Sequence, residues 1–320
     1  MPGFIQFILN IQPSSIFDAR SPQAERIREL TTGFIWAASA MLLLVIILTT
    51  WLSVKYRGRN NQQEPKQVTG NRKLEVLMVG IPLILVTGFF FWSELTMSAV
   101  LPPRGEQKPA VIITGHQWFW QADYPGTKVS TANEIHLPVG RKLLLQLNSA
   151  DVIHDWWVPA LGGKMDMIPG MDNYLWVTIR DTGVYDGACS EFCGQQHAWM
   201  RIRVVAQSPA DYDNWLATQE RPAGPPRDTL AKLGALFFLS ATCGNCHQVK
   251  GTTAMGLAGP DLTHFGSRQT MLSGMMDNDS LNVERWLGDP QKVKPGAHMP
   301  RFIFAGDSIR ALTAYLDQLK

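Results

Sequence analysis

The sequence predicts a multi-domain membrane protein with a two-helix transmembrane hairpin, a β-barrel domain and a small all-α domain. Two long apolar runs lie within the first 103 of its 320 residues. Short segments rich in β-branched and aromatic residues follow, and a Cys-x-x-Cys-His motif begins the last part of the chain. We therefore expect an N-terminal arm and hairpin at 1–103, the β domain at 104–219, a linker at 220–228 and the helical domain at 229–320.

The composition excludes some function classes. The formal net charge is only +2 and no block of like charges occurs, which disfavours a nucleic-acid partner. The 11 Trp residues suit a protein with membrane interfaces. All 4 Cys residues fall in two motifs described below, so none is left for a structural disulfide.

The first element is the hairpin. Gly33 to Val54 contains no charged residue and is long enough to span a bilayer, and Val76 to Ser93 forms a second apolar run. The Lys- and Arg-rich loop between them is expected in the cytoplasm by the positive-inside rule, which places both termini on the opposite side. The apolar piece FIQFILNI at residues 4–11 is too short to span and is expected to be an interfacial arm.

The middle of the chain is predicted to be a Greek-key barrel or sandwich. Strands are expected at Ala110–Trp120, Glu134–Asn148, Asn173–Arg180 and Met200–Val205, with Pro and Gly between them. A helix is expected at Ser208–Gln219, packed back on the strands. The Pro-rich segment at 220–228 then marks a domain boundary.

A cluster of soft metal ligands lies late in the β domain, in CSEFCGQQHAWM. Cys189, Cys193, His197 and Met200 offer thiolate, imidazole and thioether donors, the set that favours copper. A blue-copper site needs one cysteine, whereas two thiolates can bridge two copper ions and then require a second histidine. His154 in SADVIHDWW supplies it. Zinc is the alternative, but it does not explain the thioether of Met200.

Together these two segments resemble the dinuclear copper (CuA) centre of subunit II of haem-copper cytochrome c oxidases. The resemblance implies a Greek-key cupredoxin fold for the β domain. It also implies five side-chain ligands and one backbone carbonyl ligand: His154, Cys189, Cys193, His197, Met200 and the carbonyl of Glu191.

The same resemblance implies further roles. Trp118 in HQWFWQADYPG matches the exposed tryptophan at which cytochrome c delivers electrons. Asp172 and the side chain of Glu191 match residues near a Mg²⁺ or Mn²⁺ site at the subunit I interface. Glu75 matches the mouth of a proton channel shared with subunit I, although a solvated helix cap is the alternative. His136 is expected to be a structural histidine.

The helical domain begins with a haem-attachment motif. Cys243-Gly-Asn-Cys246-His247 has the spacing for two thioether bonds and a proximal imidazole. Zinc is disfavoured because the adjacent Cys246 and His247 fit poorly on one tetrahedral ion. Ala297–Pro300 resembles the methionine loop of class I cytochromes c, so Met299 is the expected sixth ligand and His298 the second choice.

Other parts of this domain fit the same interpretation. Helices are expected at Thr229–Ser240 and Ser308–Leu319. Pro260 resembles the residue whose carbonyl accepts the proximal histidine N–H, a contact that fixes the ring. Arg268 and Trp286 could meet haem propionates, although surface or core roles are the alternative.

The resemblance covers nearly the whole chain, which is identified as a member of the bacterial cytochrome c oxidase subunit II family of the fused, caa type. It implies electron transfer from a donor through haem c and dinuclear copper to haem a in subunit I, in a proton-translocating oxidoreductase whose oxygen chemistry lies in that subunit. Implied partners are subunits I and III, membrane lipid, and cytochrome c or a quinol-oxidising complex as donor. The implied location is the bacterial inner membrane, with both redox domains on the periplasmic side. The alternatives are a CuA subunit of a nitric oxide reductase and a membrane-anchored electron carrier without an oxidase partner.

Overall fold

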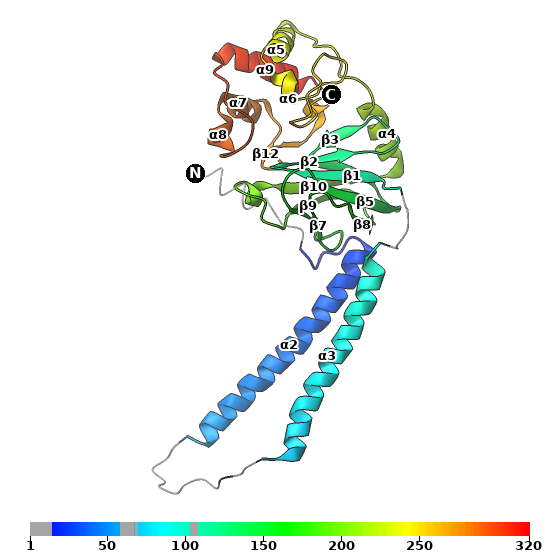
Figure 1. Ribbon diagram of the computed structural model, residues 1–320, viewed down its shortest axis with the longest axis vertical. Coiled ribbons are helices and arrows are strands. Elements are labelled where there is room, and N and C mark those ends of the chain that lie inside the picture. Colours follow the sequence, from blue (N-terminus) through cyan, green and yellow to red (C-terminus); the bar gives the residue numbers. More distant parts are fainter. Residues whose placement is uncertain (1–14, 58–66, 68–69, 103–107) are drawn as a thin grey trace. The chain divides into compact units, whose positions relative to one another are not determined.

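The computed structural model describes residues 15–57, 67, 70–102 and 108–320 (Figure 1). The expected interfacial arm at residues 4–11, most of the basic loop and the turn at Pro103 lie outside the described residues. The chain divides into two compact units, one of which is residues 25–101. The other unit combines residues 102–320 with the first 24 residues.

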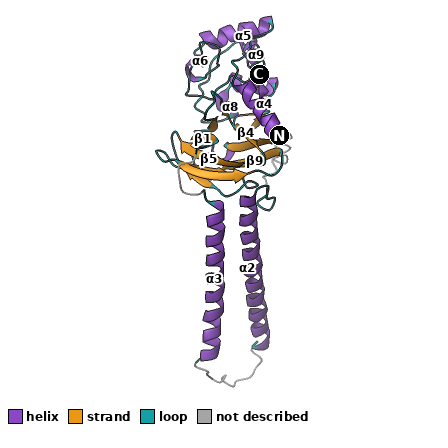
Figure 2. Ribbon diagram, turned by 90° about the vertical axis from the view of Figure 1, so that its right-hand side faces the viewer, coloured by secondary structure: helices purple, strands orange, loops and turns teal. Residues whose placement is uncertain are grey.

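The smaller unit is a pair of helices, α2 (Pro22–Lys55) and α3 (Arg72–Val100). Both are long and apolar enough to cross a membrane, and they contain the two predicted spans. They lie side by side in both views (Figures 1 and 2). A Cβ at Gly33 would lie 2.6 Å from the Trp92 ring, so the absence of a side chain allows this close helix contact. The predicted helical hairpin is confirmed.

The β domain consists of two five-stranded sheets. Pairing is antiparallel except between β1 and β5 and between β4 and β10, which are parallel. The first sheet has the order β3 (Ser130–Ala132), β2 (Phe119–Asp123), β1 (Val111–His116), β5 (Lys142–Ser149), β8 (Asn173–Thr178). The second has the order β4 (Glu134–Pro138), β10 (Arg201–Gln207), β9 (Gly183–Cys189), β6 (His154–Trp157), β7 (Met165–Met167).

Side chains alternate between the core and the outer face along these strands. In β10 every second residue is buried, as the two-residue period of a strand requires. Trp120, Ile113 and Met200 are completely buried between the sheets, and burial of each such side chain contributes about 1.5–3 kcal/mol. The helix α4 (Pro209–Gln219) packs on this domain through Tyr212 and Trp215.

Two predicted strands were wrong in length because each contains a turn. The segment predicted at Ala110–Trp120 is divided between β1 and β2, which reverse direction at Gln117 and Trp118. The segment predicted at Glu134–Asn148 is divided at Gly140, whose φ of +74° favours glycine. Aromatic residues continue across the first turn, so composition does not mark it, whereas Pro138 and Gly140 do mark the second.

The C-terminal domain is helical. Its elements are α5 (Thr229–Ser240), α6 (Cys243–Cys246), α7 (Ser280–Gly288), α8 (Pro290–Val293) and α9 (Gly306–Asp317), with the 3₁₀ turn η2 (Phe265–Ser267) and the short pair β11 (Thr270–Met271) and β12 (Met276–Asp277). The predicted first and last helices are confirmed. A Cβ at Gly234 would lie 1.9 Å from the Ala311 carbonyl oxygen, so only glycine permits this crossing of α5 and α9.

Candidate redox centres

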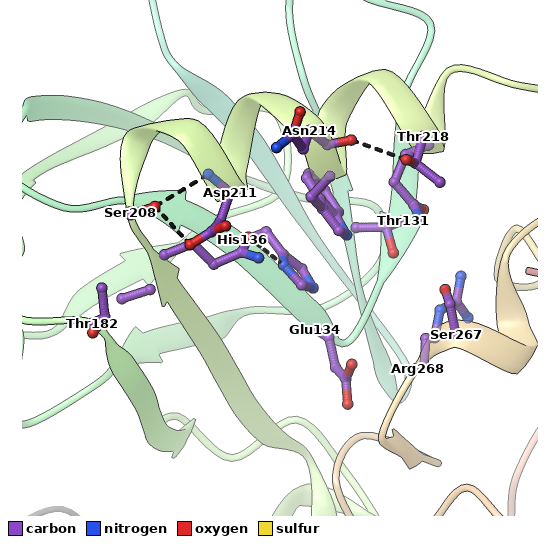
Figure 3. Close-up of a pocket in the computed structure, with 14 residues that line it drawn as sticks. Thr131, Glu134, His136, Thr182, Ser208, Asp211, Asn214, Thr218, Ser267 and Arg268 are labelled. Carbon is purple, nitrogen blue, oxygen red and sulfur yellow. Dashed lines mark hydrogen bonds between the residues drawn. The ribbon is translucent and has the colours of Figure 1, made fainter.

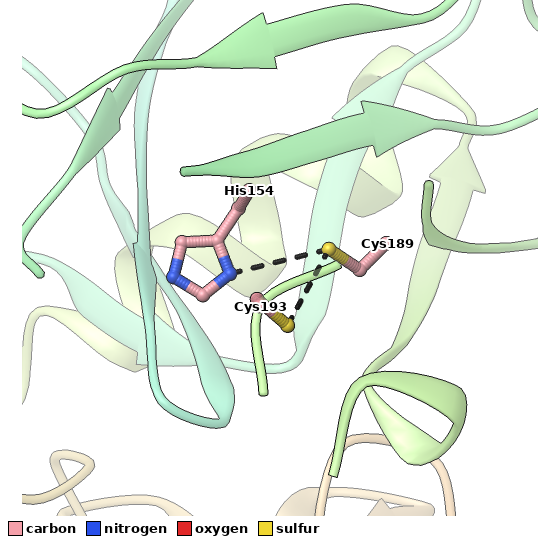
Figure 4. Close-up of side chains that lie close together, drawn as sticks. All are labelled: His154, Cys189 and Cys193. Atoms are coloured by element: carbon pink, nitrogen blue, oxygen red, sulfur yellow. Dashed lines mark hydrogen bonds between the residues drawn. The ribbon is translucent and has the colours of Figure 1, made fainter. Parts of the chain in front are cut away.

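Three buried donors meet at one end of the second sheet. His154 begins β6, Cys189 ends β9, and Cys193 follows in the next loop. Their donor atoms lie within 4.8 Å of one another (Figure 4). Among the described residues, no other group of three His, Cys, Asp or Glu side chains has this metal-binding geometry.

The remaining predicted ligands surround the same two sulfurs. The Sγ atoms of Cys189 and Cys193 are 3.8 Å apart, and His154 Nδ1 lies 4.0 Å from the first. His197 Nδ1 and Met200 Sδ each lie 3.7 Å from the second. Metal–ligand bonds of about 2.0–2.3 Å keep donors on one metal roughly 3–4.5 Å apart. Two bridging thiolates with separate end ligands therefore fit this donor set.

Local hydrogen bonds hold the loop that carries the donors. Cys189 N donates to Met200 O at 3.0 Å, which closes the loop at its base. The turn at Gly194 has φ +113°, and a Cβ there would lie 3.0 Å from the Trp118 indole. The 3₁₀ turn η1 (His197–Trp199) then turns the chain back toward β10. The spacing seen in the sequence thus becomes a compact donor loop.

A hydrogen bond joins the two thiols. The Cys193–Cys189 hydrogen bond lowers the pKa of Cys189, and the same bond, together with burial, raises the pKa of Cys193. The Cys189–Cys193 pair therefore loses one proton easily, whereas loss of a second proton from the pair is opposed. A bound cation supplies the positive charge needed to hold both sulfurs as thiolates.

Asp151 orients His154. Its Oδ1 lies 2.8 Å from His154 Nε2, which leaves Nδ1 facing the sulfurs. Burial opposes protonation of His154, but the Asp151 and Cys189 contacts outweigh it and raise the histidine pKa. A carboxylate on the far ring nitrogen is the usual support for a metal-ligating histidine. Asp151 was not among the predicted site residues, although an acid three residues before a candidate ligand was a usable signal.

Glu191 contributes its backbone rather than its carboxylate to this cluster. Its carbonyl oxygen lies 3.2 Å from Cys189 Sγ, and its side chain belongs to an exposed residue. Asp172 is also exposed and accepts a hydrogen bond from the Asn148 amide. No described contact joins these two carboxylates.

Trp118 lies directly beside the donor loop. Its indole N–H and the Gln117 amide donate to the Cys193 carbonyl at 2.9 and 2.8 Å. The expectation that Trp118 is exposed is wrong, because only 9% of it is accessible. The His298 ring of the helical domain lies 5.4 Å from it. The sequence could not show that another domain covers this side chain.

The haem motif has the geometry of an attachment site. Cys243 and Cys246 form one helical turn, with Cys246 exposed and Cys243 half-buried. His247 Nδ1 lies 2.8 Å from Pro260 O, as the resemblance implied, which leaves Nε2 for iron. A Cβ at Gly259 would lie 2.6 Å from the His247 ring. The ring is therefore fixed from two sides.

The surroundings of this motif fit a haem. Gly256 N donates to Gly244 O, and its neighbours Met255 and Leu257 are 63% and 74% exposed. A haem is a large apolar group that would cover such side chains. Met299 packs against the buried cluster of this domain, together with Cys243, whereas His298 is exposed and faces Trp118. This contrast favours Met299 over His298 as the second axial ligand.

Other predicted residues lie away from these centres. Glu75 accepts from Asn71 N at the start of α3, the contact of a helix cap.

The His136 ring stacks on Trp215 with centroids 4.1 Å apart, which is a packing role. His136 also lines a cavity of about 560 Å³ between α4 and the helical domain, and no candidate copper or haem ligand lines that cavity (Figure 3). Arg268 lines it as well and donates to Asp261 O. Trp286 packs against the buried cluster of the helical domain.

Comparisons with known proteins match both the β domain and the helical domain to families. The family model "Cytochrome C oxidase subunit II, periplasmic domain" matches residues 126–207, and the model "Cytochrome c" matches residues 231–320. Cytochrome c oxidase subunit 2 of Alkalihalophilus pseudofirmus is 34% identical over 327 residues, covering 99% of this chain and 94% of the relative. The chain belongs to the cytochrome c oxidase subunit II family.

Two further relatives carry the same description. Cytochrome c oxidase subunit 2 of Bacillus sp. strain PS3 is 31% identical and covers 83% of this chain and 80% of the relative. The Bacillus subtilis protein is 29% identical and covers 80% of this chain and 77% of the relative. A subunit II domain followed by a cytochrome c domain is the fused organisation that the sequence predicted.

Proposed function

We propose that this chain is the subunit at which electrons enter a membrane-bound cytochrome c oxidase, an oxidoreductase complex in which it partners subunit I. The observation that carries the proposal is the pair of buried sulfurs 3.8 Å apart with separate end ligands, on a chain that also bears a haem-attachment motif. When bound, dinuclear copper and haem c supply one-electron transfer from an external donor toward haem a of subunit I. The same proposal divides the chain after residues 103, 219 and 228.

The proposed copper site uses the whole donor cluster. The thiolates of Cys189 and Cys193 would hold the two copper ions together with the imidazoles of His154 and His197. Met200 and the Glu191 carbonyl complete the set, and their distances to the sulfurs support this assignment. Asp151 fixes the His154 ring so that the donor nitrogen keeps its direction.

The proposed haem site uses Cys243 and Cys246 for covalent attachment, with His247 and Met299 as axial ligands. The His247–Pro260 contact and the inward packing of Met299 support these roles. Methionine and histidine ligation raises the haem potential, which suits an electron carrier. Trp118 is proposed to lie on the path between the centres, because it contacts both the donor loop and His298.

Several finer assignments depend on partners outside this chain. We propose that Glu191 and Asp172 help bind Mg²⁺ at the subunit I surface, and that Glu75 lies at the mouth of a proton channel shared with that subunit. We also propose contacts with subunit III and lipid, and cytochrome c or a quinol-oxidising complex as donor. The positive-inside rule supports a bacterial inner-membrane location with the redox domains on the periplasmic side.

Purification of the complex from membranes tests this function. We expect a multi-span haem subunit to copurify and oxygen uptake to follow addition of reduced cytochrome c. Nitric oxide consumption without oxygen uptake would instead assign the chain to a nitric oxide reductase. Purification of the chain alone, with both cofactors but no haem subunit, would make it an anchored electron carrier.

A further inference from the structure

Buried polar groups join the helical domain to the β domain. From the β domain, the Glu134 carboxylate is only 3% exposed and accepts from Gln269 N, Thr270 N and Thr270 Oγ1 at 2.8–3.1 Å. Figure 3 shows Glu134 facing the segment that carries Ser267 and Arg268. A carboxylate with several N–H and O–H donors is well satisfied when buried.

Lys294 makes the reciprocal contact from the helical domain. It is 4% exposed, and its Nζ donates to Trp118 O at 3.0 Å and to Leu272 O at 3.3 Å. Among the described residues, no carboxylate forms an ion pair with it. Burial lowers the pKa of Lys294 to about 8, an effect that the nearby Cys193 opposes. Burial of the Lys294 ammonium costs free energy because the group loses its water. Its two hydrogen bonds to carbonyl oxygens offset that cost only while Lys294 stays in this position.

Trp118 connects this contact to the copper donors. Its carbonyl accepts from both Lys294 Nζ and Ser273 Oγ, while its indole N–H donates to the Cys193 carbonyl. Trp118 thus contacts the donor loop with its side chain and the helical domain with its backbone. A displacement of Lys294 would therefore change the position of Trp118, which contacts the donor loop.

Lys294 also begins the segment that carries the proposed axial ligand. It ends α8, where its N–H bonds to Pro290 O, and its own carbonyl accepts from Ala297 N. The next residue, Pro295, accepts from the Gln196 amide of the donor loop at 2.6 Å. This segment is therefore attached at Lys294 to Trp118 and at Pro295 to the loop that holds Cys193 and His197.

We propose that Lys294 is a positioning residue for electron transfer between the two centres: its ammonium holds the Met299-bearing segment on the Trp118 carbonyl. This inference rests on the proposed function. Because the contact covers Trp118, an external donor reacts with the haem domain and not with the tryptophan. Lys294 accordingly affects transfer inside the chain and leaves donor binding unchanged.

The test compares Lys294→Met with Lys292→Met in the full oxidase complex. Methionine keeps an unbranched apolar side chain one atom shorter and removes its donors, and Lys292 is an exposed lysine on the short helix that Lys294 caps. We expect Lys294→Met to slow haem-to-copper transfer roughly tenfold or more, as small displacements of reacting groups do. The KM for the donor and both cofactor spectra should stay at the wild-type values. Equal transfer rates in the two variants would overturn the proposal.

Hydrogen exchange gives a second readout that does not depend on electron transfer. Arg201 N donates to Ser273 O across the same contact, so its amide should exchange faster in Lys294→Met than in Lys292→Met. Unchanged exchange would contradict positioning by Lys294. If Lys294→Met does not fold, Lys294→Gln, whose shorter side chain keeps a polar end, should give the same two changes, and wild-type values in that variant would overturn the proposal. Wild-type protein with no copper or no covalent haem would contradict the proposed function instead. In that case the exchange rates of the Arg201 amide in the two variants would still test whether Lys294 positions the contact.

Discussion

The copper donors and the haem-attachment motif differ in how deeply the polypeptide buries them. His154, Cys189, Cys193 and Met200 are at most 5% exposed and belong to the packed core of the β domain. Cys246 is exposed, and apolar side chains near it or near Met299 remain open to solvent, including Ile303 at 97%. The β domain thus completes its own core, whereas the helical domain has apolar surface that a haem covers. We therefore expect loss of haem to destabilise its domain more than loss of copper destabilises the β domain.

The largest expected effect comes from removing the haem attachment. Replacing Cys243 and Cys246 by Ala should lower the free energy of unfolding of the helical domain by more than about 4 kcal/mol, because a tightly bound group stabilises only the folded state. Protease resistance and thermal unfolding of the full chain measure this. The unfolding transition of the β domain should move much less, because only its contacts with the helical domain are lost.

Asn245→Ala is the matched control for that pair of changes. Asn245 lies exposed between the two cysteines, and its replacement should preserve attachment and stability. If the helical domain is equally stable without covalent haem, then haem does not contribute to the stability of its domain, and the proposed difference from the copper site is wrong.

Asp151→Ala should weaken the copper site without unfolding the β domain. Loss of the contact to His154 Nε2 frees the ring, and loss of such a supporting contact typically lowers metal affinity 10- to 100-fold. Copper retention against a competing chelator measures the change. Asp213→Ala, an exposed acid on α4, should retain wild-type affinity. Unchanged affinity in Asp151→Ala would show that packing alone orients His154.

Trp118→Phe should have a smaller effect that is confined to transfer between the centres. It removes the hydrogen bond to the Cys193 carbonyl, a contact that contributes about 1 kcal/mol. Haem-to-copper transfer should slow while the donor KM stays constant, as measured by rapid mixing. Trp157→Phe on β6 controls for loss of an indole. A raised KM in Trp118→Phe would mean that the donor docks at the tryptophan after all.

The smallest expected effect is a pH dependence specific to the β domain. Burial lowers the pKa of His136 against a weaker opposing contact with Gln207. The unfolded chain therefore binds a proton below pH about 6.5 that the folded domain resists, so stability falls as the pH falls through this value. His136→Gln should lose less stability on acidification than the wild type. A stability difference between the two proteins that does not change between pH 8 and pH 5 would contradict this assignment.

The sequence predicted the local parts of both sites well. Cys189, Cys193, His197 and Met200 lie within twelve residues, so their spacing already limits their geometry. The same holds for the motif from Cys243 to His247. Composition likewise predicted both membrane helices, because a bilayer requires a long uncharged run.

Contacts between distant residues could not be predicted in this way. Turns inside two predicted strands were missed, and β3, β6, β7 and β9 were not expected. The groups that join Glu134 and Lys294 to the other domain are more than a hundred residues away and are mostly backbone groups, which carry no sequence signal. For the same reason the burial of Trp118 became visible only when the two domains were seen in contact.

Metal and haem analysis of the purified complex, with wild type beside Cys193→Ser, tests the central claim most directly. We predict two coppers and one covalent haem c in this chain, with a mixed-valence near-infrared band that disappears in Cys193→Ser while the haem remains. Ser190→Ala, in the same loop, should keep the band. Zinc in place of copper, or a wild-type chain without covalent haem, would contradict the account.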